Sequence, residues 1–208
     1  MSPASFIGPA EESGLIRKLT DYVVDQGLTW CRFWRQAEYP LSVSINLSVG
    51  ALTDLDYPDS LTSLCGKRRV DPGDVVLELT ESSLATDSKV LLDIVTRLRL
   101  KGFRLSIDDF GTGYSSLEQL QSLPFNELKI DKRFVEDATR SIRSALILQN
   151  SLDLAARLKM STVAEGVETN TGMQLVSRLG CDRAQGYLVA KPMPGDDLLP
   201  WLQDSVAV

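Results

Sequence analysis

Short apolar runs alternate with longer amphipathic segments along this 208-residue chain, and this alternation restricts the fold more than any other feature. Runs of this length, rich in Val, Ile and Leu, favour β-strands over helices. The predicted strands are 43–48, 75–81, 105–109, 127–131, 162–168 and 183–188. Strands that alternate with helices indicate a parallel sheet, either doubly wound or closed into a (β/α) barrel.

The amphipathic segments between the strands predict helices. Their apolar residues recur every three or four positions, as on one face of a helix. The predicted helices are about 10–26, 87–101, 140–159 and 173–179. Gly27 and Gly102 follow the first two of them, where a C-terminal cap is expected.

A polar residue stands late in each predicted strand, and this decides between the two architectures. The residues are Asn46, Glu78, Asp108, Lys129, Glu165 and Gln185. In a parallel barrel the carboxyl ends of all strands meet at one rim, where active sites are built. A doubly wound sheet would place its site at one switch point, usually with a GxGxxG turn that this sequence lacks. We therefore predict an α/β fold of the TIM-like (β/α) barrel type.

The third strand ends in two adjacent carboxylates, Asp108 and Asp109, and Gly111 and Gly113 bracket the loop that follows. Burying two anions together is costly unless a cation neutralises them, which suggests a metal site. Asp before a glycine-rich break is also common in turns and at helix N-caps. This stretch alone leaves both interpretations open.

The chain contains no histidine. This excludes Ser–His and Cys–His nucleophile pairs and histidine-ligated zinc. The three cysteines are scattered and outside any CxxC spacing, which argues against a disulfide framework or a zinc knuckle. Carboxylates, amides and lysine remain, and the oxygen donors among them suit Mg²⁺ or Mn²⁺.

Composition narrows the class of protein further. The net charge is −6 and no basic run is present, so the chain is not expected to bind a nucleic-acid polymer. No apolar run reaches the roughly 18 residues of a membrane span, and the N-terminus lacks a signal-peptide pattern, so we expect a cytoplasmic protein. Residues 1–208 are expected to form one domain.

Six ordered motifs together closely resemble the bacterial EAL domain. They are Asn46-Leu47-Ser48, Glu78-Leu79-Thr80-Glu81, Asp108 to Gly113, Lys129-Ile130-Asp131, Ala164 to Thr169 and Gln185-Gly186-Tyr187. Members of that family are phosphodiesterases that open cyclic di-GMP to the linear dinucleotide pGpG. The resemblance covers nearly the whole chain.

The resemblance implies a role for each matching residue. Those that match positions which bind or support two Mg²⁺ or Mn²⁺ ions are Asn46, Glu78, Asp108, Asp109, Glu165 and Gln185. Lys129 matches a catalytic lysine beside the attacking water, although an ion pair with Asp131 on the same strand face is the alternative. Glu81 and Glu168 match residues that support the loop of Gly111 and Gly113, which influences metal binding and dimer contacts.

One departure from the family sets a further expectation. Family members begin with two additional strands, the second of which ends in Glu-Ala-Leu and supplies a metal-binding glutamate. Neither strand is present, so we expect an N-terminally truncated barrel with six of eight strands. Open strand edges favour a homodimer, and a fused or separate sensor domain is compatible with the family.

Three functions follow from this departure. The first is a cyclic di-GMP phosphodiesterase domain that is weak or inactive as this chain alone. The second is a receptor that binds cyclic di-GMP without turnover. The third is a regulatory or dimerisation module, and the six retained polar residues weigh against it.

Overall fold

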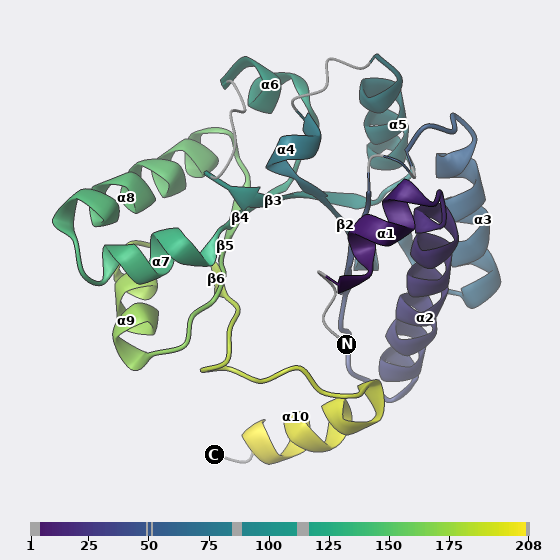
Figure 1. Ribbon diagram of the computed structural model, residues 1–208. Coiled ribbons are helices and arrows are strands. Elements are labelled where there is room, and N and C mark those ends of the chain that lie inside the picture. Colours follow the sequence, from purple (N-terminus) through teal and green to yellow (C-terminus); the bar gives the residue numbers. More distant parts are fainter. Residues whose placement is uncertain (1–4, 49, 51, 85–88, 112–116, 207–208) are drawn as a thin grey trace.

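The strands form one parallel sheet in which spatial order equals sequence order. The computed structural model describes residues 5–48, 50, 52–84, 89–111 and 117–206. In this part of the chain the sheet order is β1 (Val43–Asn46), β2 (Val75–Thr80), β3 (Arg104–Phe110), β4 (Glu127–Ile130), β5 (Ser161–Ala164) and β6 (Arg183–Ala184). Figure 1 shows that the sheet is curled and that its two edge strands do not meet. The fold is therefore a TIM-like barrel, incomplete over the described residues.

Most of the helices line the outside of the curled sheet, whereas the last one lies on its open side (Figure 1). In chain order they are α1 (Ile7–Glu12), α2 (Ile16–Gln36), α3 (Tyr57–Arg68), α4 (Glu81–Leu84), α5 (Lys89–Leu100), α6 (Leu117–Ser122), α7 (Lys132–Ala138), α8 (Ile142–Arg157), α9 (Asn170–Arg178) and α10 (Leu198–Val206). Two 3₁₀ turns, Pro72–Asp74 and Gly195–Asp197, precede β2 and α10. The crossover helices place all strand carboxyl ends at one rim.

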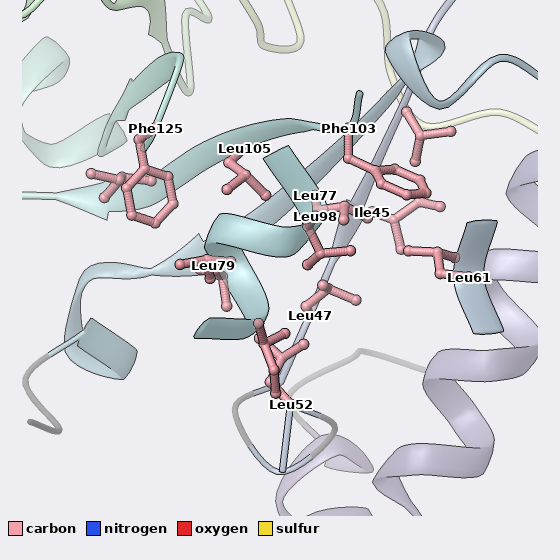
Figure 2. Packing of buried hydrophobic residues seen from close by; sticks show 14 of the residues in the cluster. Ile45, Leu47, Leu52, Leu61, Leu77, Leu79, Leu98, Phe103, Leu105 and Phe125 are labelled. Atoms are coloured by element: carbon pink, nitrogen blue, oxygen red, sulfur yellow. The ribbon is translucent and has the colours of Figure 1, made fainter. Parts of the chain in front are cut away.

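The main hydrophobic core lies between the sheet and the helices, and Figure 2 shows part of it. Leu77, Leu98, Phe103 and Leu105 are fully buried there. Each such side chain stabilises the fold by roughly 1.5–3 kcal/mol relative to an exposed position. A second cluster contains Ile130, Val135 and Leu148 with neighbours from α9. Strand β3 alternates between this core and the lumen, since Leu105 and Ile107 lie on one face and Ser106 and Asp108 on the other.

The first predicted helix has different boundaries in the structure, and Gly27 is not its cap. The segment forms α1 and α2, and α2 continues as a helix to Gln36. Gly27 lies in the interior of α2, where a Cβ atom would stand 3.2 Å from Cδ1 of Ile45. The glycine therefore permits close packing of α2 on β1, a role that local sequence does not distinguish from capping.

Strand β6 is much shorter than the predicted 183–188. It ends at Ala184, after which the backbone pairs with the segment that follows β5. The amide of Gln185 donates to the carbonyl of Ala164 at 2.8 Å, and the amide of Val167 donates to the carbonyl of Gln185 at 3.0 Å. The amide of Leu188 still donates to the carbonyl of Val167 at 3.1 Å, but the amide of Val189 donates to the carbonyl of Gly186, so the chain turns here instead of continuing as a strand.

The segment after β6 runs along the open side of the sheet towards α2 (Figure 1). Gly195 lies so close to Trp30 of α2 that a Cβ atom there would stand 2.4 Å from the indole ring. Within the described part of the chain, no helix combines the length and the apolar character needed to cross a membrane.

Candidate metal centre and active site

Four predicted site residues meet inside the curled sheet around the side chain of Lys129. Its Nζ atom lies 2.9 Å from Oε2 of Glu78, 3.0 Å from Oδ1 of Asp108 and 2.8 Å from Oε1 of Glu165. Lys129 and Glu78 are only 5% and 4% exposed. Residues from β2, β3, β4 and the end of β5 thus form one buried charged cluster, as expected for the rim of a parallel barrel.

A β-bulge brings Asp108 and Asp109 to the same side of the sheet. Adjacent strand residues normally point to opposite faces. Here the β3–β4 register shifts between Ile107 and Phe110, and Asp109 has φ = 55°. Carboxylate oxygens of Asp108, Asp109 and Glu165 consequently lie within 4.8 Å of one another. The bulge turns two neighbours in sequence into two candidate ligands of one site.

The electrostatics of the cluster follow from burial. Burial raises the pKa of Glu78 and of Glu165 above the ordinary value, although Lys129 opposes the rise. Burial, then the negative charges of Asp108 and Asp131, raises the pKa of Asp109. Burial by itself would lower the pKa of Lys129, but Glu78, Glu165 and Asp108 outweigh it and raise that pKa. The carboxylates therefore require positive charge nearby to remain ionised.

The donor set fits a hard divalent cation. Asp108, Asp109 and Glu165 present carboxylate oxygens close enough to share an ion, and hard cations prefer oxygen. Glu78 adds a fourth carboxylate beside Asp108 through their common partner Lys129. These residues are thus suited to Mg²⁺ or Mn²⁺ and unsuited to a soft metal.

The two predicted amide ligands lie at the edges of this cluster. Asn46 ends β1 opposite Glu78 in the β1–β2 register and lines a cavity of about 650 Å³ beside Ser48 and Thr80. Gln185 directly follows β6 and lines a second cavity, of about 240 Å³, with Glu78 and Lys129. Both side chains are exposed at the carboxyl ends of the outermost described strands.

The two glutamates predicted to support the loop after Asp109 lie in different parts of the structure. Glu81 is 3% exposed, and its Oε2 atom accepts a hydrogen bond from the amide of Gly111 at 2.9 Å. Glu168 is exposed and lines a small cavity between α7 and the segment after β5. Gly113 lies outside the described residues, so its predicted hinge role, like the contact of Glu168 with that loop, stays a prediction.

Asp131 is not the partner of Lys129, in contrast to the alternative that the sequence offered. Its Oδ1 atom caps the N-terminus of α7 and accepts hydrogen bonds at 2.9 Å from the amide and from Nε of Arg133. It also lies near enough to Asp109 to hydrogen-bond with it. Sequence reasoning gave Asp131 no part in the site, although it directly follows β4 as Glu165 follows β5 and Gln185 follows β6.

Ser44 is a second neighbour that sequence reasoning missed. It shares the cavity of Glu78 and Lys129 and makes a side-chain hydrogen bond to Glu78. Strand alternation could have indicated it, because Ser44 stands two residues before Asn46 on the same face of β1.

The sequence profile of the EAL domain matches residues 1–192 of this chain. The chain belongs to the EAL domain family.

Relatives that this chain resembles in sequence include three proteins of Pseudomonas aeruginosa. The bifunctional diguanylate cyclase/cyclic di-GMP phosphodiesterase MucR is 36% identical over 96% of this chain and 29% of its own length. The cyclic di-GMP phosphodiesterases PA2567 and RocR are 34% and 33% identical over 98% and 99% of the chain. The chain spans 35% of the length of PA2567 and 52% of that of RocR.

Solved EAL structures share the fold. The MucR phosphodiesterase in complex with c-di-GMP superposes with a TM-score of 0.90 at 35% identity, covering 95% of this chain and 81% of that one. The EAL domain of Mycobacterium smegmatis DcpA gives a TM-score of 0.85 at 33% identity, over 90% and 85% of the two chains.

Proposed function

We propose that this EAL domain binds cyclic di-GMP and hydrolyses one of its phosphodiester bonds to give linear pGpG, with two Mg²⁺ or Mn²⁺ ions. The observation that carries the proposal is the cluster of Glu78, Asp108, Asp109 and Glu165 around Lys129. The names of relatives that cover 96% or more of this chain support the substrate.

Each residue of the cluster contributes a distinct property. The carboxylates of Asp108, Asp109 and Glu165 would bind the ions, and Glu78, Asn46 and Gln185 would add oxygen donors at the edge. When bound, the ions lower the pKa of a water molecule and neutralise charge on the scissile phosphate. Lys129, already deprived of solvent, offers N–H donors that orient the attacking water or stabilise negative charge on the phosphate in the transition state.

The surroundings of the cluster favour a large anionic ligand once the ions are present. The four carboxylates and one lysine carry excess negative charge, so divalent ions must precede a phosphodiester. The cavity of Gln185 is lined by Glu78 and Lys129 of the cluster, and the cavity of Asn46 lies beside the carboxyl ends of β1 and β2.

We further propose that this chain by itself is a weak or inactive catalyst. The sheet has six strands over the described residues. The glutamate of the family's Glu-Ala-Leu segment is not among the carboxylates of the cluster. Binding of cyclic di-GMP without turnover is the second candidate function. The other expected metal ligands are present, but the carboxylate of the Glu-Ala-Leu segment is missing from the site.

The test is hydrolysis of cyclic di-GMP with Mg²⁺ or Mn²⁺, followed by chromatography of pGpG, together with nucleotide binding in Ca²⁺. The chain is compared with its Glu78→Gln variant and with Glu136→Gln, an exposed glutamate of α7, as the control. Any turnover should vanish in Glu78→Gln and persist in Glu136→Gln. Turnover above roughly 1 s⁻¹ would overturn the proposed weakness, and absence of both binding and turnover would overturn the proposed substrate.

Family resemblance also supports a homodimer, a cytoplasmic location and a fused or separate sensor domain, all of which we propose. Light scattering on the purified chain between 1 and 100 μM tests the dimer, because an equilibrium between one and two copies shifts with concentration.

A further inference from the structure

Two segments that carry candidate metal ligands approach the same turn of one helix. The backbone at Gly111 follows Asp109, and the backbone at Gly166 follows Glu165. A Cβ atom at Gly111 would stand 2.7 Å from Cε2 of Phe134, and one at Gly166 would stand 2.2 Å from Cβ of Lys132. Phe134 and Lys132 both belong to the first turn of α7.

Both contacts require glycine. Gly111 has φ = 97° and Gly166 has φ = 62°, values that favour glycine over residues with a side chain. The distances leave no room for a methyl group, so the two backbones lie directly against α7. The first turn of α7 is itself fixed, because Asp131 caps it through the amide of Arg133 at 2.9 Å.

The Gly111 backbone is fixed from two directions. Its amide donates to Glu81 at 2.9 Å on one side, and the ring of Phe134 covers its Cα on the other. Phe134 is partly buried and packs on the second hydrophobic cluster, which limits the positions of its ring. Two residues earlier, Asp109 adopts the left-handed conformation that an aspartate does not favour by itself.

A strained residue persists where its surroundings determine the backbone on both sides. Asp109 is preceded by the β3 ladder and followed by the Gly111 contact. We infer that Phe134 is a positioning residue of the site: its ring presses on Gly111 and thereby keeps the Asp109 bulge in the conformation that directs this carboxylate towards Asp108 and Glu165. The inference rests on the proposed function only in calling this cluster a metal site.

The first experiment measures Mn²⁺ affinity by calorimetry on Phe134→Ala, well below its melting temperature. Val135→Ala is the matched control, since Val135 is 2% exposed on the same helix and does not face Gly111. We expect Phe134→Ala to weaken Mn²⁺ binding about 10- to 100-fold, as for other residues that orient metal ligands. Val135→Ala should lower the melting temperature but leave Mn²⁺ affinity unchanged. Equal effects of the two variants on Mn²⁺ affinity would overturn the inference.

A second experiment uses the metal-free protein and measures the free energy of unfolding, so variants that are partly destabilised can still be compared. Unfolding is compared for Gly111→Ala, Phe134→Leu and the double variant. If the ring presses on Gly111, Gly111→Ala should be less damaging when leucine replaces Phe134, because the smaller side chain can retreat. Additive effects would contradict the contact. Wild-type protein that fails to bind Mn²⁺ would defeat the proposed function, whereas this cycle would still decide whether the ring of Phe134 presses on Gly111, the contact on which the inference depends.

Discussion

Nζ of Lys129 lies 2.9 Å from Oε2 of Glu78, although strand β3 separates the strands that carry the two residues. The contact spans the inner face of the curled sheet, where both side chains are almost excluded from water. A buried charge is costly without a partner, so in the metal-free protein this lysine supplies the positive charge that the carboxylates require.

Removing that charge should destabilise the metal-free protein. For Lys129→Met we expect a loss of about 3–5 kcal/mol in the free energy of unfolding, the usual cost of breaking a buried pair. Mn²⁺ should restore part of it, because the ion replaces the missing positive charge. Denaturant unfolding with and without Mn²⁺ measures both effects. Lys101→Met is the control, since its partner Asp59 is 55% exposed and ion pairs in contact with water contribute little to stability. Equal losses in the two variants would contradict this account.

Acid should release the metal at a higher pH than ordinary carboxylates would. The pKa values of Glu78, Asp109 and Glu165 are raised, so protons compete with Mn²⁺ already above the ordinary values of 4.5 and 3.8. The effect of pH on folding has the opposite sign. Raised carboxyl pKa values mean that the folded metal-free state binds more protons than the unfolded state, so these groups stabilise the fold as the pH falls. Calorimetry between pH 8 and 5 should therefore show affinity falling without unfolding. Constant Mn²⁺ affinity down to pH 5 would refute the prediction.

Gly186 and Gly66 should respond to alanine in opposite directions. A Cβ atom at Gly186 would stand 2.3 Å from the backbone nitrogen and oxygen of Val167, which cannot move aside cheaply. We expect Gly186→Ala to cost about 1–3 kcal/mol, as other overpacked sites do, and to displace the adjacent Gln185. Gly66 lies within α3 and has nothing within 4 Å of its Cβ position, so alanine should stabilise it by about 0.5–1 kcal/mol. Thermal melting of the two variants checks both signs.

Asp182 should make stability depend on pH in the acidic range. Hydrogen bonds from the amide and the hydroxyl of Thr162, each 2.8 Å long, lower the pKa of this carboxyl below 3.8. A lowered pKa means that the unfolded state binds the proton first, so this contribution is complete above pH 3.8 and is lost as pH falls through the folded-state pKa. Asp182→Asn retains an acceptor but cannot titrate. Its melting temperature should decline less steeply than that of the wild type between pH 5 and 2.5, and parallel curves would refute the assignment.

Much of the fold could be predicted because strand and helix periods are local. The strands that contain Val43, Val75, Leu105, Leu128 and Val163 were all predicted, and so was their parallel arrangement. Helix α3 was missed, since its apolar residues give only a weak amphipathic pattern. The length of β6 was also wrong, because a strand at the edge of a sheet ends where its single partner allows.

For the candidate site, too, one part could be predicted from the sequence and another could not. The sequence predicted a site that binds metal through oxygen atoms. This prediction rested on the absence of histidine and on the positions of Glu78, Asp108 and Glu165 late in separate strands. The positioning role proposed for Phe134 could not be predicted from the sequence. Its contact with Gly111 joins residues 23 positions apart, which no helix or strand period relates.

By itself, the sequence determined the alternation of strands and helices, the family, and which polar residues stand at strand ends, because each is a property of neighbouring residues. Only the tertiary structure decided that Asp108 and Asp109 share one side of the sheet, since that depends on the register shift of β3 against β4 and on the left-handed conformation of Asp109. It also decided that Lys129 pairs with Glu78, Asp108 and Glu165 instead of Asp131. Burial in the curled sheet makes each of these charges costly without a partner of opposite charge, and burial is a property of the whole fold.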